Sequence, residues 1–467
     1  MALISREKAD AASAKIYPPR SAVISWILFD WAAQPYFTLI TTFVFAPYFA
    51  THVAADPASG QALWGFATAA AGIAIALLSP VLGAIADASG RRKPWIAAFG
   101  AMLVIGSALM WFGRPGEISV IPHLLLAYAI ATVGVEFATV FNNAMMPSLV
   151  PPDRIGRLSG TGWATGYVGG ILSLILVLGF LAANPLTGRT LFGLKPLFGL
   201  DPVTHQGDRI SGPLTGLWFI VFVLPMFLLT PDYPARHPPR QALREGLADL
   251  RNTLHELPKQ PSLALFLLAN MIYTDGLVSL FAFGGIYAAG TFAWNTIQIG
   301  TFGIILAIAG AFGGWIGGKL DDHFGAKRVI VASLTILLGS IIAILLVNKD
   351  SILFITIAPP VPGGPLFGSS AERAYLLLGC LIGACGAPLQ AASRSLLIRM
   401  APKDRIAQYF GLFALTGRVT SFVGPLLIGL VTAQTKSQKA GMATLVLFFA
   451  AGLALLWRVN GGSAGRR

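Results

Sequence analysis

The chain has 467 residues, of which 55% are hydrophobic and only 11% are charged. Ordinary soluble domains carry about 25% charged residues, so this much apolar surface could not be hidden from water. Disorder is also excluded, because it requires few apolar residues and many charges. The composition therefore indicates an all-α polytopic membrane protein. The net charge of +13 could suggest nucleic-acid binding, so the placement of the cations has to decide that point.

Apolar stretches recur along the whole chain. A membrane helix needs about 20 predominantly apolar residues, and on that basis we predict twelve spans. The first six cover residues 21–50, 62–85, 94–112, 121–146, 159–183 and 216–230, the sixth with a possible upstream extension. The other six cover residues 263–289, 297–317, 329–347, 374–398, 407–433 and 441–456.

Lysine and arginine are distributed unevenly between the loops. With both termini cytoplasmic, 24 of the 33 cations lie on the cytoplasmic side and eight lie outside, while Arg418 alone falls inside a span. Membrane proteins carry such an excess in their cytoplasmic loops. We therefore predict cytoplasmic termini, in a bacterial inner (plasma) membrane. No nucleic-acid partner is expected, because the cations are spread over every inner loop instead of one surface.

Two loop motifs repeat in the two halves of the chain. The loop after the second span reads GAIADASGRRK at 83–93, and the loop after the eighth reads GKLDDHFGAKR at 318–328. PPDRI at 151–155 likewise matches PKDRI at 402–406. Two six-span halves in parallel repeat are the architecture of a carrier with a site between the halves.

The repeat also predicts the domain organisation. Residues 1–20 form a cytoplasmic segment, 21–230 the first half, 262–458 the second half, and 459–467 a cytoplasmic tail. The linker at 231–261 has leucines at 243, 247, 250, 254 and 257, which make one apolar stripe on a helix. We predict an amphipathic cytoplasmic helix there, acting as a structural tether or a regulatory site.

These motifs resemble the signature of the major facilitator superfamily. FDWA at 29–32, FNNA at 141–144, YTDG at 273–276 and QAASRS at 390–395 are similar to elements of its vacuole-effluxer-like branch. One departure is Ala33, where the branch would place an asparagine. The resemblance implies a twelve-helix transporter in two six-helix halves, with amino-acid export suggested for vacuolar relatives.

The repeated loop after the second and eighth spans is our predicted gating motif. Its glycines allow neighbouring helix ends to approach, its aspartates can accept from N–H groups at a helix N-terminus, and its cations can pair with acids or lipid phosphates. Such contacts could latch an inner gate, although the cations could equally serve only to set topology. The motif comprises Gly83, Asp87, Gly90, Arg91, Arg92, Gly318, Asp322, Gly325, Lys327 and Arg328.

Three acids, Asp30, Glu136 and Asp275, fall well inside spans, with Arg418 as the corresponding cation. Ionisable groups in a bilayer are costly and normally face a cavity or a partner. Asp30 and Asp275 occupy equivalent spans and lie about 14–18 Å deep, so we expect them to face a central cleft. Two uncompensated acids suit proton coupling or the binding of a substrate amine. The alternative is a structural acid–arginine pair beside a neutral acid.

Polar or aromatic residues at similar depths complete the predicted cleft. With the four charged residues, the candidate set is Asp30, Trp31, Gln34, Glu136, Asn142, Asn270, Tyr273, Asp275, Gln390 and Arg418. Arg394 lies about one turn from the inner end of its span and could extend to the interface, so it is ranked below them. Each tyrosine or asparagine alone could instead be an interhelical hydrogen-bond partner.

The predicted function is a secondary transporter that moves a small solute by alternating access. An amino acid or a similar zwitterion is the favoured substrate, and coupling to protons is left open. A non-transporting receptor or scaffold and an intramembrane enzyme are the alternatives. No catalytic residue, cofactor or metal site is predicted, because the six histidines are scattered without paired spacing and Cys380 and Cys385 form no framework. We expect a monomer in the lipid bilayer.

Overall fold

The computed structural model describes residues 17–88, 91–151, 155–232, 255, 257–358, 365–401, 409, 412–413, 416–417 and 419–459, without the side chains of residues 80, 81, 83–88, 147, 155–157, 159, 160 and 322. Ten helices within this part are long and apolar enough to cross a membrane. The remaining two are the predicted first span, which is interrupted, and the predicted eleventh span, whose described helix is short. The predicted linker helix lies outside the described residues.

The first half begins with a span that is interrupted by proline. α2 (Arg20–Pro35) is followed by a π-helix, η1 (Tyr36–Phe43), then α3 (Phe45–Tyr48) and a second π-helix, η2 (Phe49–Val53). Pro35 has no N–H to donate to the Trp31 carbonyl four residues earlier, and the indole of Trp218 donates to that carbonyl instead, at 3.1 Å. The break explains why the span is absent from the ten regular ones.

The other elements of the first half are more regular. The sixth span starts ten residues upstream of the predicted position, at Gln206. The remaining bounds are α4 (Pro57–Ala88), α5 (Lys93–Leu109), η3 (Met110–Phe112), η4 (Ile118–Val120), α6 (Ile121–Asn143), α7 (Met146–Leu149), α8 (Ile155–Leu176), η6 (Val177–Leu181), η7 (Leu197–Gly199), α9 (Gln206–Arg209) and α10 (Ser211–Leu229).

The second half repeats the arrangement. After η8 (Leu257–Lys259) its helices are α12 (Pro261–Phe292), α13 (Thr296–Phe324), α14 (Ala326–Leu345), α15 (Ser370–Met400), α17 (Val423–Thr435) and α18 (Gln438–Trp457). A small antiparallel sheet that the sequence did not predict joins α14 to α15, in the order β1 (Val347–Asn348), β2 (Ser351–Ile352) and β3 (Ile355–Thr356). Asn295 and Ser369 begin α13 and α15 with capping boxes.

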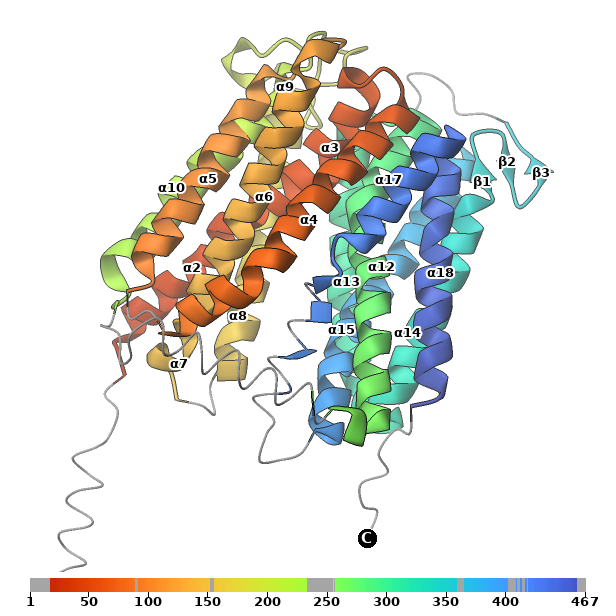
Figure 1. Cartoon of the computed structure of the whole chain (residues 1–467). Coiled ribbons are helices and arrows are strands. Elements are labelled where there is room, and N and C mark those ends of the chain that lie inside the picture. Colours follow the sequence, from red (N-terminus) through yellow and green to blue (C-terminus); the bar gives the residue numbers. More distant parts are fainter. Residues whose placement is uncertain are drawn as a thin grey trace, which may run out of the picture.

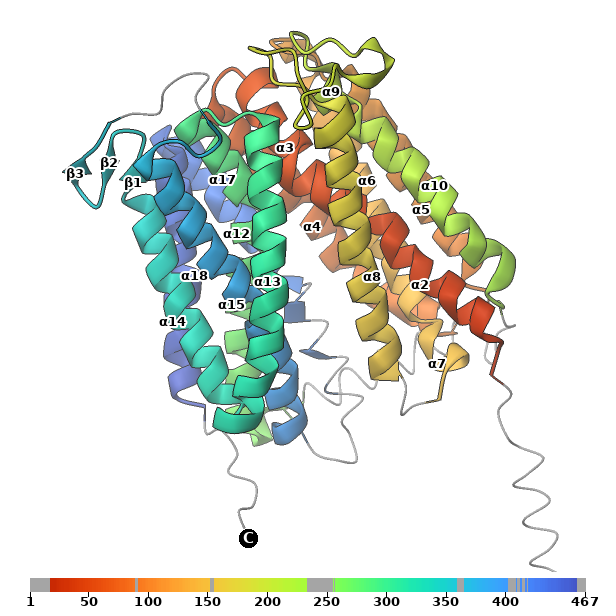
Figure 2. The ribbon, with the colours of Figure 1, turned by 180° about the vertical axis from the view of Figure 1, so that it is seen from behind.

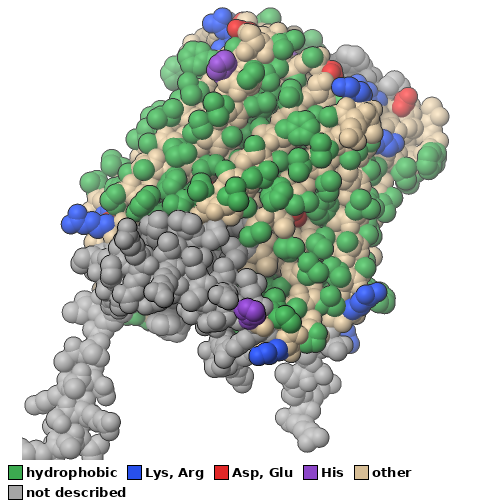
Figure 3. All heavy atoms as spheres, viewed as in Figure 1, with side chains coloured by type: hydrophobic (Ala, Val, Ile, Leu, Met, Phe, Trp, Pro, Cys, Tyr) green, Lys and Arg blue, Asp and Glu red, His purple; other side chains and the backbone are tan. Residues whose placement is uncertain are grey.

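The two halves stand side by side and their ribbons converge at the end of the bundle far from the termini, which we call the distal end (Figures 1 and 2). The opposite, terminal end holds the start of α2 and the end of α18. On the face shown in Figure 3, hydrophobic side chains cover the flank of the bundle, and most of the visible Lys and Arg side chains lie towards its two ends. This surface suits a protein surrounded by lipid.

Small residues let the halves approach closely at the distal end. A Cβ at Gly65 of α4 would lie 2.8 Å from the Pro425 carbonyl and 3.0 Å from Gly429 of α17, so backbones are in contact there. A Cβ at Gly285 of α12 would overlap the Thr42 carbonyl of η1. The contact between halves is therefore built on glycine in α4, α12 and α17.

Candidate functional site

Asp30 lies in the seam between α2 and α8. A Cβ at Gly162 of α8 would overlap its carboxylate, and one at Gly166 would lie 3.2 Å from its carbonyl. One turn further along α2, the Gln34 side chain lies 2.9 Å from the Cβ position of Gly170. The glycines of α8 thus make room for the polar side of α2. Among the described residues Asp30 has neither a hydrogen bond nor an ion pair.

Asp275 occupies the equivalent seam in the second half, between α12 and α17. This residue is 5% exposed. A Cβ at Gly424 of α17 would overlap the Ser279 hydroxyl and lie 3.3 Å from the Asp275 carbonyl. Each acid is therefore followed, four residues later, by a polar side chain packed on a glycine of the fifth or eleventh span. The two halves therefore share this arrangement within their spans, in addition to the loop motifs that repeat in the sequence.

A polar network joins three helices of the first half near Glu136. The Tyr36 hydroxyl lies 2.6 Å from that of Thr132 and donates to the Tyr128 carbonyl at 3.2 Å. The Tyr128 hydroxyl in turn lies 3.1 Å from that of Thr68. Glu136, one turn after Thr132 on α6, is close enough to act electrostatically on the Tyr36 hydroxyl. Of these residues, Glu136 belonged to the predicted cleft, whereas Tyr128, Thr132 and Thr68 were not predicted.

The remaining polar candidates of the second half, Asn270, Tyr273 and Gln390, differ in burial and in hydrogen bonding. The buried Tyr273 hydroxyl lies 2.6 Å from that of Ser393, so it connects α12 to α15. Asn270 is buried at 3% exposure, while Gln390 on α15 is half-buried. Tyr273 also packs on Gly452 of α18, which gives it a packing role as well as a hydrogen bond.

The structure also describes the contacts of Trp31 and Asn142, two predicted cleft residues of the first half. Trp31 stacks on Trp218 of α10 at 5.9 Å between ring centroids and contacts Gly169 of α8. Asn142 is fully buried, its backbone carbonyl accepts from the Trp26 indole at 2.8 Å, and neither side-chain amide atom has a partner. An unpaired buried amide is costly, so Asn142 is the most anomalous polar group described in this half.

Arg418 lies outside the described residues, so its place in the cleft stays a prediction. A different arginine, Arg394 of α15, is exposed and acts electrostatically on Tyr167 of α8, in the other half. Tyr167 is 50% exposed and its ring lies 6.0 Å from that of Trp163. In the sequence analysis Arg394 was ranked below the candidate set because it lies near the inner end of its span. Its depth could not reveal that Trp163 and Tyr167 lie opposite it in the other half.

At the terminal end, one lysine of each repeated loop, Lys93 and Lys327, makes a contact within its own half. The Lys93 ammonium donates to the Phe227 carbonyl at 2.8 Å, and that of Lys327 donates to the Val459 carbonyl at 2.6 Å. Each lysine thus ties the third or ninth span to the end of the sixth or twelfth, where the helix dipole favours a cation. Gly325, with φ +88°, occupies a conformation that favours glycine between α13 and α14.

Two aspartates beside the motif make contacts that the structure describes. Asp232 accepts from the backbone N–H groups of Arg92 at 2.8 Å and Lys93 at 3.2 Å, which is the kind of contact we predicted for Asp87. Asp321 pairs with Arg399 at 3.0 Å. Arg91 and Arg328 are exposed, and Gly318 has open space around it. Gly90 and the side chains of Asp87 and Asp322 lie outside the described residues, and so do the surroundings of Gly83.

At the distal end, hydrogen bonds connect the two halves. The Gln61 amide of α4 donates to the Thr432 hydroxyl at 2.9 Å and to the Gln438 carbonyl at 3.2 Å. The Gln438 amide donates to the Pro57 carbonyl at 2.9 Å, and the Thr296 hydroxyl donates to Asp208. The described side-chain contacts thus hold the distal end closed, while Lys93 and Lys327 bind within their own halves.

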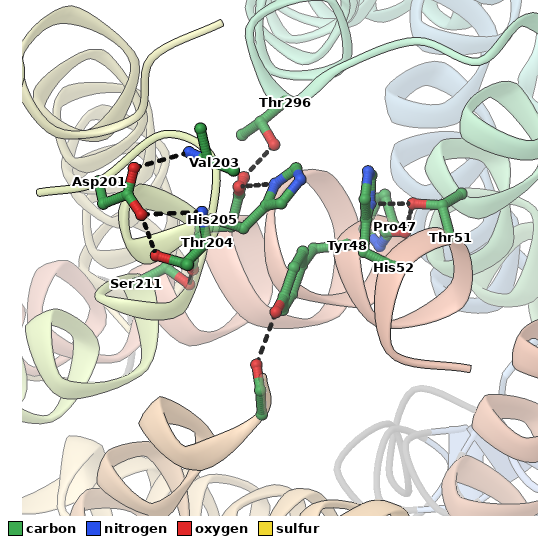
Figure 4. Close-up of polar contacts among 12 residues, drawn as sticks. Pro47, Tyr48, Thr51, His52, Asp201, Val203, Thr204, His205, Ser211 and Thr296 are labelled. Carbon is green, nitrogen blue, oxygen red and sulfur yellow. Dashed lines mark hydrogen bonds and ion pairs between the residues drawn. The ribbon is translucent and has the colours of Figure 1, made fainter. Parts of the chain in front are cut away.

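Two histidines that are far apart in sequence meet at this end. The rings of His52 and His205 have centroids 4.0 Å apart, and His205 Nδ1 lies 2.8 Å from Asp208 Oδ2 (Figure 4). The sequence offered no signal for this pair, because the two residues belong to different loops. The six histidines are therefore less scattered than the spacing suggested, and this cluster is the clearest feature that the sequence missed.

Comparison with known proteins decides the family. The profile described as "Vacuole effluxer Atg22 like" matches residues 153–466. The chain belongs to this family. The uncharacterised MFS-type transporter YxiO of Bacillus subtilis is 25% identical over 92% of this chain and 93% of its own length. Autophagy-related protein 22 of Cryptococcus neoformans is 23% identical over 65% of this chain, but this match spans only 50% of the fungal protein.

Solved structures of similar shape are also transporters of the major facilitator superfamily. A bacterial homologue of the human lysosomal transporter Spinster, in an inward-facing conformation, has a TM-score of 0.62 and 13% identity over 94% of this chain and 95% of its own. The inward-open xylose transporter XylE from E. coli gives 0.61 with 12% identity over 96% of both chains. The Atg22-like protein is thus an MFS-type, multi-pass membrane transporter with the twelve-helix, two-half fold, as predicted.

Proposed function

We propose that this Atg22-like protein is a secondary transporter that moves a small solute by alternating access, with its central site at the two acid-bearing seams. The observation that carries the proposal is the symmetric placement of Asp30 and Asp275. Each is an acid inside a span, set against the glycine-bearing helix of its own half. Rocking of the halves would change the exposure of both acids together, as alternating access requires.

The charges favour a substrate with a cationic group. Asp30 has no ion-pair partner among the described residues, and a carboxylate deep in a bilayer must bind a proton or a cation to be tolerated. A substrate amine would satisfy one acid, and a proton on the other would give coupling. Arg394, with the Trp163–Tyr167 pair facing it, is suited to a carboxylate. A small zwitterion such as an amino acid meets both requirements.

The supporting residues are assigned on the same basis. We propose that the cleft includes Gln34, Glu136, Asn142, Asn270, Tyr273, Gln390 and Arg418. Trp31 would hold α2 in position through its stacking on Trp218 of α10. The gating motif would exchange its contacts within each half for contacts across the terminal end when the distal end opens. The excess of cations around the termini supports a cytoplasmic terminal end, and the near full-length match to YxiO supports a bacterial plasma membrane. We propose a monomer.

The experiment has a binding stage and a flux stage. Purified protein is screened by thermal shift against amino acids, nucleosides, sugars and cations, and a compound that stabilises it is then used in proteoliposomes with and without a pH gradient. Asp30→Asn and Asp275→Asn should each abolish pH-driven flux, while Asp350→Asn, in the exposed distal turn, should not. Full pH-driven flux in both acid variants would refute the coupling role. A ligand that binds but never crosses the membrane would favour the receptor alternative.

A further inference from the structure

The small sheet of the second half contains a strained turn between β2 and β3. These strands pair Ile352 with Ile355, so Leu353 and Phe354 form a two-residue turn between them. Their φ angles are +47° and +71°. Positive φ at both positions is typical of a type I′ turn, which asparagine and glycine normally supply. Bulky side chains are strained in this conformation, and such strain persists where the surroundings maintain it.

The same turn exposes its apolar side chains. Leu353 is 52% exposed, Phe354 86% and Ile355 69%. We call these three consecutive residues the hairpin tip. Ile352 and Ile357, by contrast, pack against the hydrophobic core and hold the base of the hairpin in place. The hairpin therefore combines an anchored base with an exposed apolar end, which is the mark of a surface that meets another apolar phase.

The hairpin tip lies at the level where a membrane helix ends. α14 has 20 residues, about 30 Å, which matches the thickness of the hydrocarbon core. Only Leu346 separates α14 from β1, and its carbonyl accepts from the Leu353 N–H at 3.0 Å. This bond places the turn beside the end of α14. The other turn of the sheet, Lys349 and Asp350, lies one strand, about 7 Å, further along.

The sheet extends sideways from the second half, on the side away from the first half (Figures 1 and 2). β1 and β2 contact α14 and α15, while β3 is the outer strand. The same two helices expose large apolar side chains near their distal ends, Ile342 at 43% and Leu377 at 64%. The hairpin tip is therefore continuous with the lipid-facing flank of the bundle.

A hairpin can lie against lipid because its backbone groups are bonded within the sheet. Besides the bond from Leu353, the Ile357 N–H donates to the Asp350 carbonyl at 2.8 Å. An irregular loop would instead bring unpaired N–H and C=O groups to a medium without partners for them. The exposed Lys349 lies on the outer side of the sheet, and segments at the membrane interface combine such cations with phenylalanine and leucine.

The first half carries a comparable feature. Phe198 of η7 has φ +58° and is 90% exposed, beside Leu197 at 45% and the exposed Lys195. The loop that holds η7 and the three-stranded sheet lie on opposite sides of the distal end (Figures 1 and 2). One protein partner would have to reach both sides, whereas the bilayer surrounds both. The symmetry therefore favours lipid as the partner of these apolar loops.

We propose that the hairpin tip inserts into the distal leaflet of the membrane, with its three side chains below the phospholipid headgroups and Lys349 at the level of the phosphates. Insertion removes from water the apolar surface that the turn exposes, and this gain maintains the strained backbone. The contact fixes the depth of the distal end of the second half in the bilayer.

The test places an environment-sensitive dye beside an intact turn in the full chain. Cys380 and Cys385 are replaced by serine, and nitrobenzoxadiazole is attached at Ile355→Cys or, for comparison, at Asp350→Cys of the outer turn. The protein is placed in nanodiscs of phosphatidylcholine and phosphatidylglycerol, with or without nitroxide-labelled phospholipid. At Ile355→Cys we expect strong quenching by the lipid nitroxide and several-fold weaker quenching by iodide than at Asp350→Cys.

A matched variant removes the apolar turn residues and keeps the turn. Leu353→Asn combined with Phe354→Gly supplies the residues that a type I′ turn prefers, so the hairpin is retained without strain. In this variant the dye at Ile355→Cys should lose its quenching by lipid and reach the iodide quenching seen at Asp350→Cys. If the double variant does not fold, Phe354→Asn replaces it and should raise iodide quenching in the same direction.

Three results would overturn the proposal. The first is equal iodide quenching at Ile355→Cys and Asp350→Cys in the unmodified turn. The second is protection from iodide without quenching by lipid, which would mean that protein covers the hairpin tip. The third is unchanged quenching after the turn residues are replaced.

Insertion of the hairpin tip is independent of the proposed transport function. The fluorescence needs no substrate, so a tip that stays in water would leave the assignment of the acid-bearing seams intact. Conversely, a chain that moves no solute would still hold its hairpin in the membrane.

Discussion

Gln61 of α4 offers the most direct test of how the halves are held together. Its side chain is fully buried, and its amide donates to the Thr432 hydroxyl at 2.9 Å and to the Gln438 carbonyl at 3.2 Å, both in the other half. The Gln61 carbonyl oxygen has no partner. Substitution of Gln61 by leucine keeps a similar volume and removes both bonds between the halves together with the unpaired acceptor.

The magnitude follows from these two bonds. Hydrogen bonds between membrane helices contribute on average about 0.6 kcal/mol and at most about 1.7 kcal/mol each. Loss of two should destabilise the distal-closed form by about 1–2 kcal/mol relative to the open form, in which water replaces the lost partners. This free energy corresponds to about a 5- to 30-fold rise in the ratio of open to closed protein. Since the unpaired acceptor is also removed, the lower part of this range is expected.

The assay measures the distance between spin labels attached at Leu186→Cys of the first half and Phe354→Cys of the second, which are 76% and 86% exposed. Cys380 and Cys385 are first replaced by serine, and distances are recorded in lipid nanodiscs at pH 7.5. Thr335→Val is the matched control, because the Thr335 hydroxyl donates at 2.9 Å to the Val331 carbonyl of its own helix and makes no contact between halves. An unchanged distance distribution in Gln61→Leu would refute the reasoning, as would an equal change in the control. The first result would mean that packing at the glycine contacts holds the distal end closed without help from these hydrogen bonds, and the second would mean that the change does not come from bonds between the halves.

Two further predictions concern the first half. Asp232→Ala should lower the free energy of unfolding by about 1–2 kcal/mol, because two N–H groups at the start of α5 lose their acceptor and the helix dipole loses a nearby anion. Scanning fluorimetry should show a lower melting temperature for this variant than for the control Asp350→Ala. Equal melting temperatures would contradict the capping role. Gly162→Ala should displace the Asp30 carboxylate, which its Cβ would overlap; ligand-induced thermal shift should then fall towards the Asp30→Asn value, and an unaltered shift would contradict the seam.

The acids illustrate how far the sequence could reach. Their depth in the first and seventh spans follows from counting residues, so Asp30 and Asp275 could be named as candidates. Their actual neighbours, Gly162 and Gly424, depend on the rotation of each helix and on which helix packs beside it. Rotation cannot be read from spans that are apolar all round. The sequence therefore identified the acids but not the seams.

The start of α5 and the pair of His52 and His205 show the same limit. Asp232 accepts at the start of α5 although it comes from the end of the sixth span, while the contacts predicted for Asp87 stay a prediction. His52 of η2 and His205 at the start of α9 are separated along the chain by four spans, and they meet only because the helices bring their distal ends together. Contacts between residues distant in sequence leave no mark on local spacing, so neither could be predicted.

The sequence by itself determined the environment, the number of spans, the two repeated halves and the family, because these depend on composition and on local patterns that need no partner. The terminal excess of lysine and arginine is equally a property of the sequence, and it still underlies the proposed orientation. Only the tertiary structure decided which end of the bundle is closed, which cations bind within a half, and which histidines meet. Those outcomes arise from helix rotation and from the contact between halves, where glycine allows backbones to touch and buried polar groups must find partners across the interface.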